Sequence, residues 1–424
     1  MKKESALNFI ELSVKWLAIC FPFLIAAGKG AADAGVVTLA AFFVIYSITA
    51  KDFRFLKEKW VIAAGTLWVY LILRGLFSPD IKHALVKVLP FVRFILFAVC
   101  LEFLASKDSK TSSKMFVTTC IVLAFLTVDG FIQFFTGFDL FGKPKYGIRL
   151  TGPFSKQILG TTIASIGIIV MAGLIPLLKK SKNYLWFILS AGVLTYIIVF
   201  LAGERAAFLR LNISIVLLFL GLYLKTKNAQ IKKNIWKTAV LTVLLCLVVV
   251  QVISFLKPEN VHRQLASSIQ EATSSQSSYI FLWKTGLKAG FSNIFFGIGP
   301  NQFEFFCKAN AIPGLGCATL DNIYYHPHNI WIEIFAESGL VGVGLLGALI
   351  YALGQRLVKF CTTCSNIFEC SLAIGVGLAA FQRLLPLPSS GFFKNWYAVP
   401  IWFAIGWMLC ICATHMNKAS RNKV

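Results

Sequence analysis

The stretch HPHNIWIEIFAESGLVGVGLLGALIYAL, residues 326–353, decides how this chain is organised. Its first four residues close a long polar segment, and an apolar run from Ile330 to Leu353 follows directly. About 20 mostly apolar residues suffice for a helix to cross a bilayer. The run therefore predicts a membrane-spanning helix, and we expect His328 at the rim of the membrane, where that helix begins.

The rest of the chain repeats this apolar pattern. Of its 424 residues 57% are hydrophobic and only 14% are charged, and the mean hydropathy of +0.75 excludes an ordinary soluble domain. We predict an all-α polytopic integral membrane protein with about twelve transmembrane helices and one large extracytoplasmic loop. The predicted spans are residues 9–27, 32–50, 59–78, 84–105, 115–136, 157–178, 184–202, 206–224, 236–256, 328–354, 366–385 and 397–415. Nine spans thus fill residues 1–256, the loop fills 257–327, and three spans with a tail fill 328–424.

The net charge of +23 is concentrated in alternate short loops between the predicted spans. Because cytoplasmic loops of membrane proteins are enriched in Lys and Arg, these loops and both termini are expected in the cytoplasm. This pattern explains the charge without nucleic acid, which is excluded as a partner. The basic residues are Lys51, Arg54, Lys57, Lys59, Lys107, Lys110, Lys114, Lys179, Lys180, Lys182, Lys225, Lys227, Lys232, Lys233, Lys237, Arg356, Lys359, Lys418, Arg421 and Lys423.

The loop 257–327 is the one extensive segment outside the predicted membrane, and so long a loop is usually functional. Its apolar patches Tyr279–Leu287 and Phe291–Ile298 predict short helices along the membrane surface, and the Ser-rich piece 266–278 predicts a hinge or a helix with a polar face. Cys307 and Cys317 are the only cysteines expected outside, where they could pair or stay reduced.

No metal site is predicted. The spacing Cys361-Thr-Thr-Cys364 resembles a metal or redox pair, but it lies beside a helix end and no second pair follows it. The predicted outer loops also contain no acidic cluster of the kind that holds a divalent cation. The remaining cysteines lie mostly within spans, where cysteine acts as a small hydrophobic residue.

Ionisable residues inside a membrane are costly and therefore mark candidate functional sites. Arginine is preferred where a phosphate is gripped by a bidentate fork, so a basic funnel at the outer face predicts a lipid-linked diphosphate as ligand. Alternatively, these cations reach the headgroups or pair with Glu204 and Asp129. The cations expected at the outer face are Arg74, Lys87, Arg93, Arg149, Arg205 and Arg383, and Arg210 is a further arginine within a span.

His328 is placed for acid–base chemistry. The positive end of a helix dipole lowers a histidine pKa, which keeps the ring neutral and able to accept a proton. The spacing of Gly339 places it on the same helical face, where it would permit close helix approach. Glu333 and Glu337 point elsewhere and are expected to pair with basic groups on neighbouring helices. The alternative is that His326 or His328 only caps the helix.

Two spaced motifs resemble a known family. Arg205-x-x-x-Leu209, followed after the long loop by His328-x(10)-Gly339, resembles the paired signature of the bacterial O-antigen ligases. The runs Trp283–Pro300 and Arg149–Phe154 are similar to segments of the wider ligase and polymerase superfamily. One departure is the missing arginine before Trp283. Its nearest substitutes here are Arg263, Lys284 and Lys288.

The resemblance implies a membrane-embedded, GT-C-like glycosyltransferase of lipopolysaccharide biosynthesis. It would transfer a glycan with inversion from undecaprenyl diphosphate to a sugar hydroxyl of lipid A–core, at the periplasmic face of the inner membrane. His328 would activate the hydroxyl and Arg205 would stabilise the departing diphosphate, without metal or other cofactor. Residues expected to bind the diphosphate are Arg149, Arg74, Arg93, Lys87, Lys284 and Arg383, and those expected to complete the motif are Gly339, Leu209, Glu333 and Glu337.

Two other functions fit parts of the same pattern. An O-antigen polymerase would use the same donor but join repeat units on the lipid carrier. A polysaccharide or lipid transporter would share the twelve-span layout, but no internal repeat or paired broken helices relate the two halves of this chain. Partners expected for the ligase are the lipid-linked glycan, the lipid A–core acceptor and membrane lipids.

Overall fold

The computed structural model describes residues 2–154, 158–176, 184–226, 229–256, 258, 262, 278–309, 318–319, 322–323 and 326–421. The fold is all-α, apart from strands β1 and β2 of two residues each, which pair antiparallel in the large loop. The elements are α1 (Lys2–Ala27), α2 (Lys29–Ala50), η1 (Arg54–Lys57), α3 (Lys59–Leu76), α4 (Ile81–Val88), η2 (Leu89–Phe91), α5 (Val92–Phe103), η3 (Ala105–Lys107), α6 (Thr111–Thr136), α7 (Leu159–Leu174), α8 (Tyr184–Leu201), α9 (Arg205–Lys225), α10 (Ala229–Leu256), α13 (Ser278–Ser292), α14 (Phe303–Ala309), β1 (Ala318–Thr319), β2 (Asn322–Ile323), α15 (Ile330–Thr363), α16 (Ile367–Phe381), η6 (Gln382–Leu384) and α17 (Asn395–Arg421).

The prediction of an all-α polytopic membrane protein is confirmed. Within the described residues, ten helices are long and apolar enough to cross a bilayer. The two other predicted spans, 157–178 and 184–202, correspond to the shorter apolar helices Leu159–Leu174 and Leu189–Leu201. Each apolar run of the sequence thus forms a helix where it was expected.

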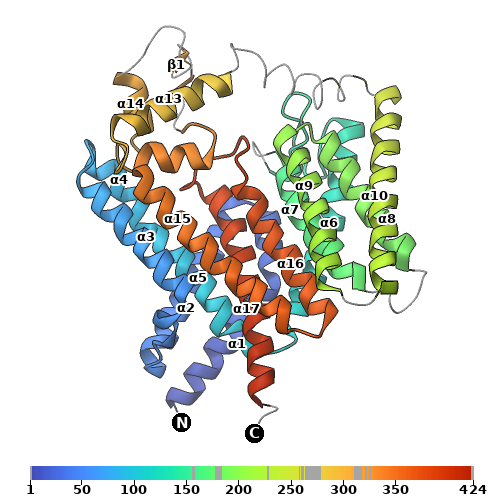
Figure 1. Ribbon diagram of the computed structural model, residues 1–424, viewed down its shortest axis with the longest axis horizontal. Coiled ribbons are helices and arrows are strands. Elements are labelled where there is room, and N and C mark those ends of the chain that lie inside the picture. Colours follow the sequence, from blue (N-terminus) through green and yellow to red (C-terminus); the bar gives the residue numbers. More distant parts are fainter. Residues whose placement is uncertain are drawn as a thin grey trace.

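Helix α17 lies at the centre of the bundle. In its apolar window 94% of the residues are buried inside the protein, against 11% in α10, which stands at the edge. Helices α5 and α16 pack against α17, while α6 to α10 form a group beside them (Figure 1). Figure 1 also shows both termini at one end of the bundle, with α13, α14 and β1 at the opposite end.

Helix α15 extends further than the predicted span 328–354, to Thr363. Arg356 was expected in a loop, but it lies within the helix, where its guanidinium donates to the carboxylate of Glu102 over 2.8 Å. Glu102 is only 2% exposed and also accepts from the indole of Trp60 at 2.8 Å. This buried pair compensates the charge of Arg356 and lets the helix continue.

Helix α15 is also broken within the membrane. Gly339 has φ 64 and ψ −165, so two helices meet there at a kink. Segment 294–299 packs against the break through four main-chain hydrogen bonds. The amides of Ile298 and Gly299 donate to the carbonyls of Ala336 and Glu337, at 2.9 and 3.0 Å respectively. The amides of Leu340 and Val341 donate to the carbonyls of Ile294 and Phe295, at 2.9 and 3.2 Å respectively.

The break corrects two expectations. Gly339 does not continue the helical face of His328, and what it admits at close range is the backbone of 294–299 rather than another helix. A Cβ on Gly339 would lie 2.2 Å from the carbonyl carbon of Phe295. The patch Phe291–Ile298 was expected as a helix but is mostly turn, and its backbone bonds to the break in α15. The patch Tyr279–Leu287 does lie in α13.

We predict that Gly339→Ala lowers stability by at least about 1–3 kcal/mol, because alanine adds backbone strain at positive φ and a steric clash. The matched control is Gly344→Ala in the same helix, since a Cβ there meets nothing within 4 Å. Thermal unfolding of the purified proteins in detergent measures both. Equal unfolding midpoints for the two variants would contradict this account of the break.

Candidate functional site

The loop before α15 is held in an unusual conformation. Asn329 caps the helix, because its side-chain oxygen accepts from the amides of Trp331 and Ile332 at 3.0 and 3.3 Å. His328 has φ 53, a left-handed conformation that non-glycine residues rarely adopt. Its amide donates to Nδ1 of His326 at 3.1 Å. The helix cap is therefore Asn329, and neither histidine serves that purpose.

The ring of His328 is oriented by the loop between α16 and α17. Its Nδ1 lies 3.2 Å from the carbonyl oxygen of Ser389, and the amide of Ser389 donates to the carbonyl of His328 at 2.8 Å. A carbonyl can only accept, so Nδ1 carries the proton and Nε2 carries the lone pair. The Tyr279 ring, from the first turn of α13, meets the imidazole edge-on at 5.8 Å.

Both histidines of this loop are neutral at pH 7. Burial, and then the charge of Lys394, lowers the pKa of His328 to about 4. Burial lowers the pKa of His326 well below its usual range, with smaller effects of His328 and Lys394. The neutral base expected from the helix position is thus supported, although burial is its main cause.

The two glutamates of α15 bind main-chain amides instead of the basic side chains that were expected. Both oxygens of Glu333 accept from the amide of Phe392 at 3.1 Å. Glu337 accepts from the amide of Asn301 at 2.7 Å. These buried carboxylates fix the loop before α17 and the loop before α14 against the start of α15, with Lys394 in electrostatic contact with Glu333.

Arg383 and Arg210 are buried near the loop between α16 and α17 that orients the His328 ring. Arg383 is 1% exposed, and it donates from Nε to Ser165 Oγ at 3.2 Å and from Nη2 to the Thr161 carbonyl at 3.5 Å. Arg210 is 2% exposed and donates from Nη2 to the Pro388 carbonyl at 2.7 Å. Pro388 precedes the residue that orients the His328 ring.

Each of these two arginines has a buried N–H group that forms no hydrogen bond with a described residue. Within the described residues, Nη1 of Arg383 and Nε of Arg210 are buried without a hydrogen-bond partner, and neither guanidinium forms an ion pair. The side-chain amide of Gln382 is likewise buried without a partner among those residues, and the hydroxyls of Ser389 and Tyr397 interact with each other. Buried uncompensated charge is costly unless an anion neutralises it. We name this set, Arg210, Gln382, Arg383, Ser389 and Tyr397, the buried cation cluster.

Arg205 is the first residue of α9, as expected, and is half-buried. Leu209, one turn on, is 45% exposed on the outside of the bundle. Glu204 interacts electrostatically with Arg383 without forming a salt bridge, and it accepts from the amide and hydroxyl of Thr161 at 2.8 and 2.5 Å. The same helix thus supplies Arg205 at its start and Arg210 to the loop that orients His328.

The other predicted cations divide into two groups. Arg74 donates to the carbonyls of Phe296 and Gly297, and Arg93 donates to Asp33, Pro90 and Asn395. Their guanidinium groups hold loops in place. Lys87 and Lys284 are exposed, Arg149 is half-buried, and Arg263 lies outside the described residues, as do Cys317 and most of segment 266–278.

Sequence reasoning left Arg210, Ser389, Tyr397 and Lys394 out of the site. Arg210 was recognised as an arginine within a span, but its partner lies 178 residues further along the chain. The sequence signal that could have found Ser389 and Lys394 is the polar loop 386–396 between two spans, and Tyr397 directly follows that loop. Among the described residues, no group of His, Cys, Asp and Glu suited to a metal ion gathers at this site.

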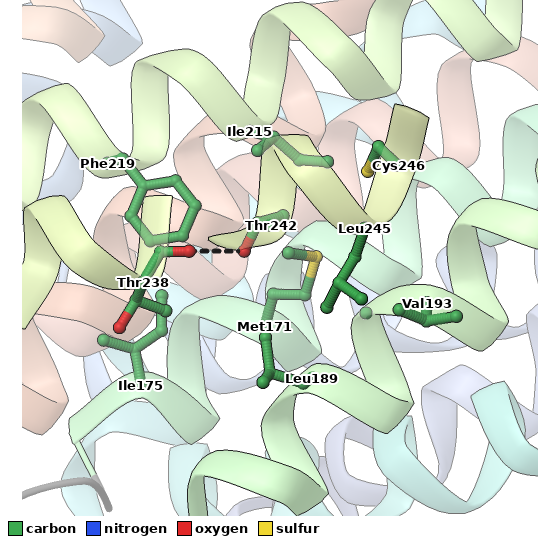
Figure 2. Close-up of a pocket in the computed structure, with 11 residues that line it drawn as sticks. Met171, Ile175, Leu189, Val193, Ile215, Phe219, Thr238, Thr242, Leu245 and Cys246 are labelled. Atoms are coloured by element: carbon green, nitrogen blue, oxygen red, sulfur yellow. Dashed lines mark hydrogen bonds between the residues drawn. The ribbon is translucent and has the colours of Figure 1, made fainter. Parts of the chain in front are cut away.

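A separate, partly open apolar pocket lies among α7, α8, α9 and α10 (Figure 2). Its polar atoms are few, and the hydroxyls of Thr238 and Thr242 donate to carbonyls of their own helix at 2.9 and 2.8 Å. The pocket is therefore apolar and has no catalytic group among its lining residues. Its lining residues are Met171, Ile175, Leu189, Gly192, Val193, Ile215, Phe219, Thr238, Thr242, Leu245 and Cys246.

We predict that His328 contributes to the acid sensitivity of the fold. An unfolded histidine titrates near pH 6.5, and the pKa of about 4 in the fold means that the unfolded chain binds more protons between these values. Stability present above about pH 6.5 is then lost as the pH falls towards 4. The fall in unfolding temperature from neutral to acidic pH should be smaller for His328→Gln than for the wild type. An equal fall in unfolding temperature for the wild type and His328→Gln would show that the pKa of His328 is not lowered in the fold.

A family model described as O-antigen ligase matches residues 190–347. The match covers Arg205, the large loop, His328 and the break at Gly339. A search of curated proteins gives no match. Residues 190–347 of this chain are thus similar to the O-antigen ligase family, and this similarity is consistent with the wider ligase and polymerase superfamily.

Proposed function

We propose that the protein is an O-antigen ligase, which transfers a glycan from undecaprenyl diphosphate to a sugar hydroxyl of lipid A–core. The observation that carries the proposal is the placement of a neutral, oriented histidine beside two buried arginines with unpartnered donors. The histidine suits the activation of a hydroxyl nucleophile, and the two arginines suit the binding of a diphosphate leaving group.

His328 is the general base in this mechanism. Ser389 holds the ring by its Nδ1 proton, so that Nε2 can accept the proton of the acceptor hydroxyl as that oxygen attacks the anomeric carbon. A base of this kind contributes roughly 10²–10⁴-fold to rate. Direct attack opposite the leaving group forms one glycosidic bond, breaks the bond to the diphosphate and inverts the anomeric configuration.

The arginines stabilise the leaving group. As the glycosidic bond to phosphate breaks, the electron pair moves to the diphosphate, where Arg205 and the buried cation cluster offset the added charge. Fixed cations in an apolar site do so more effectively than in water. The proposed reaction takes its positive charge from arginines and requires no divalent metal.

The distribution of charge between the two ends of the bundle is consistent with a periplasmic site. The lysine-rich loops and both termini would face the cytoplasm, which places His328, the loops before α15 and α17, and the start of α9 at the periplasmic face of the inner membrane. The donor lipid would then lie in the outer leaflet of that membrane.

The fate of the lipid-linked glycan in a deletion strain tests the proposal. Loss of a ligase leaves polymerised glycan on its lipid carrier and lipid A–core unmodified. Capping of the core with single repeat units would instead identify a polymerase, which uses the same donor. Normal lipopolysaccharide in the deletion strain would contradict both activities.

We predict that His328→Ala and Arg205→Ala each lower glycan transfer by about 10²–10⁴-fold. Arg205→Lys should also lose most activity, because lysine keeps the charge but not the planar fork. Transfer is measured with purified protein, donor and acceptor in detergent. The control is Arg54→Ala, whose exposed guanidinium pairs with Asp52 far from the site. Wild-type rates in the His328 or Arg205 variants would refute their assigned roles.

We predict that Arg383→Met weakens donor binding by about 10- to 100-fold, the effect of losing a hydrogen bond between charged groups. Its unfolding temperature should be unchanged or raised, since a buried uncompensated charge is replaced by an apolar side chain of similar length. Donor KM and thermal unfolding are measured together. A lowered unfolding temperature with unchanged donor KM would show that Arg383 is only structural.

A further inference from the structure

A second cluster of reactive side chains lies at the opposite end of the bundle from His328, where the termini lie (Figure 1). Cys364 follows the end of α15, Glu369 lies in the first turn of α16, and His415 lies near the end of α17. The thiol sulfur of Cys364, a carboxylate oxygen of Glu369 and a ring nitrogen of His415 all lie within 4.8 Å of one another.

This spacing suits a single metal ion. Ligand atoms about 2.0–2.3 Å from a tetrahedral ion stand roughly 3.3–3.7 Å apart. Nδ1 of His415 is 3.9 Å from Oε2 of Glu369, and the three ligand atoms, which lie within 4.8 Å of one another, would have to approach by up to about 1 Å to hold one ion. A thiolate, an imidazole and a carboxylate together favour Zn²⁺ over the hard cations Mg²⁺ and Ca²⁺.

More thiols surround these three groups. The thiol of Cys361 is hydrogen-bonded to that of Cys370, and the thiols of Cys370 and Cys412 interact electrostatically with that of Cys364. Four of the eleven cysteines of the chain therefore gather in one place. A water molecule or one of these thiols could complete a tetrahedral set.

The surrounding backbone is fixed and the site can be reached. Nζ of Lys225 donates to the carbonyls of Cys361 and Cys364, the latter at 2.8 Å, which holds the turn between α15 and α16. The side chains of His415 and Glu369 are 25% and 20% exposed. An ion could thus enter from the aqueous side of the bundle end without the bundle opening.

We infer that Cys364, Glu369 and His415 form a binding site for a zinc-class metal ion. The ion would join the end of α15, the start of α16 and the end of α17. The other end of the α16–α17 hairpin carries Ser389, which orients His328. The site is separate from the proposed glycan transfer and would fix the hairpin at its far end.

The spacing of residues in the sequence does not reveal the other proposed ligands beside Cys364. A Cys-x-x-Cys spacing predicts a metal site when a second pair follows, and none does here. Here the fold provides the remaining ligands from the next helix and from a residue 51 positions further on, across the α16–α17 hairpin.

Metal analysis of the full-length protein, purified in detergent without chelators, tests the inference. We expect about one zinc ion per chain. After removal of zinc, Co²⁺ should give a thiolate-to-cobalt charge-transfer band together with the visible absorption of a tetrahedral ion. Cys364→Ser, His415→Ala and Glu369→Gln should each raise the dissociation constant for Zn²⁺, the first two by at least about 100-fold.

The matched control is Cys20→Ser, whose exposed thiol lies in α1, outside this cluster. It should bind zinc as the wild type does. Variants are compared only where gel filtration shows the wild-type elution profile. Wild-type protein with only trace zinc and no cobalt charge-transfer band would overturn the inference. So would a Cys361–Cys370 disulfide in metal-free purified protein, which would identify the cluster as a redox pair.

Discussion

The cost of burying positive charge in an apolar bundle shapes the site. Arg383 and Arg210 are almost completely buried, yet no carboxylate pairs with them in the described part of the chain. Their bonds go to carbonyl and hydroxyl oxygens of α7 and of the loop between α16 and α17. A fold that buries such charges without acidic partners retains capacity for an anion, and these arginines lie near the loop that orients the His328 ring.

The geometry of His328 depends on contacts from four directions. Asn329 begins the helix, Ser389 orients the ring, Tyr279 covers its edge, and Glu333 holds the loop that carries Ser389. The break of α15 at Gly339 brings segment 294–299 into the bundle and fixes the large loop there. Gly339 therefore acts by admitting the backbone of segment 294–299, and it has no direct contact with His328 among the contacts of the described residues.

Local patterns predicted much of the molecule. Apolar runs located the helices, and the position of Arg205 at a helix start was correct. The neutral ring predicted for His328 agrees with its lowered pKa, but the main cause is burial and not the expected helix dipole. The remainder depends on partners distant in the chain. No periodicity reveals that Glu333 and Glu337 bind amides, that Arg210 reaches Pro388, or that Glu102 keeps Arg356 within a helix. The break at Gly339 escaped prediction because a glycine inside an apolar run also suits close helix packing.

The most direct measurement is a cryo-electron microscopy structure of the protein with undecaprenyl diphosphate bound. The account predicts diphosphate density against the unpartnered donors of Arg383 and Arg210 and near Arg205. Nε2 of His328 would then face the position of the sugar. Diphosphate bound at the opposite end of the bundle, or held by exposed lysines away from His328, would contradict the account.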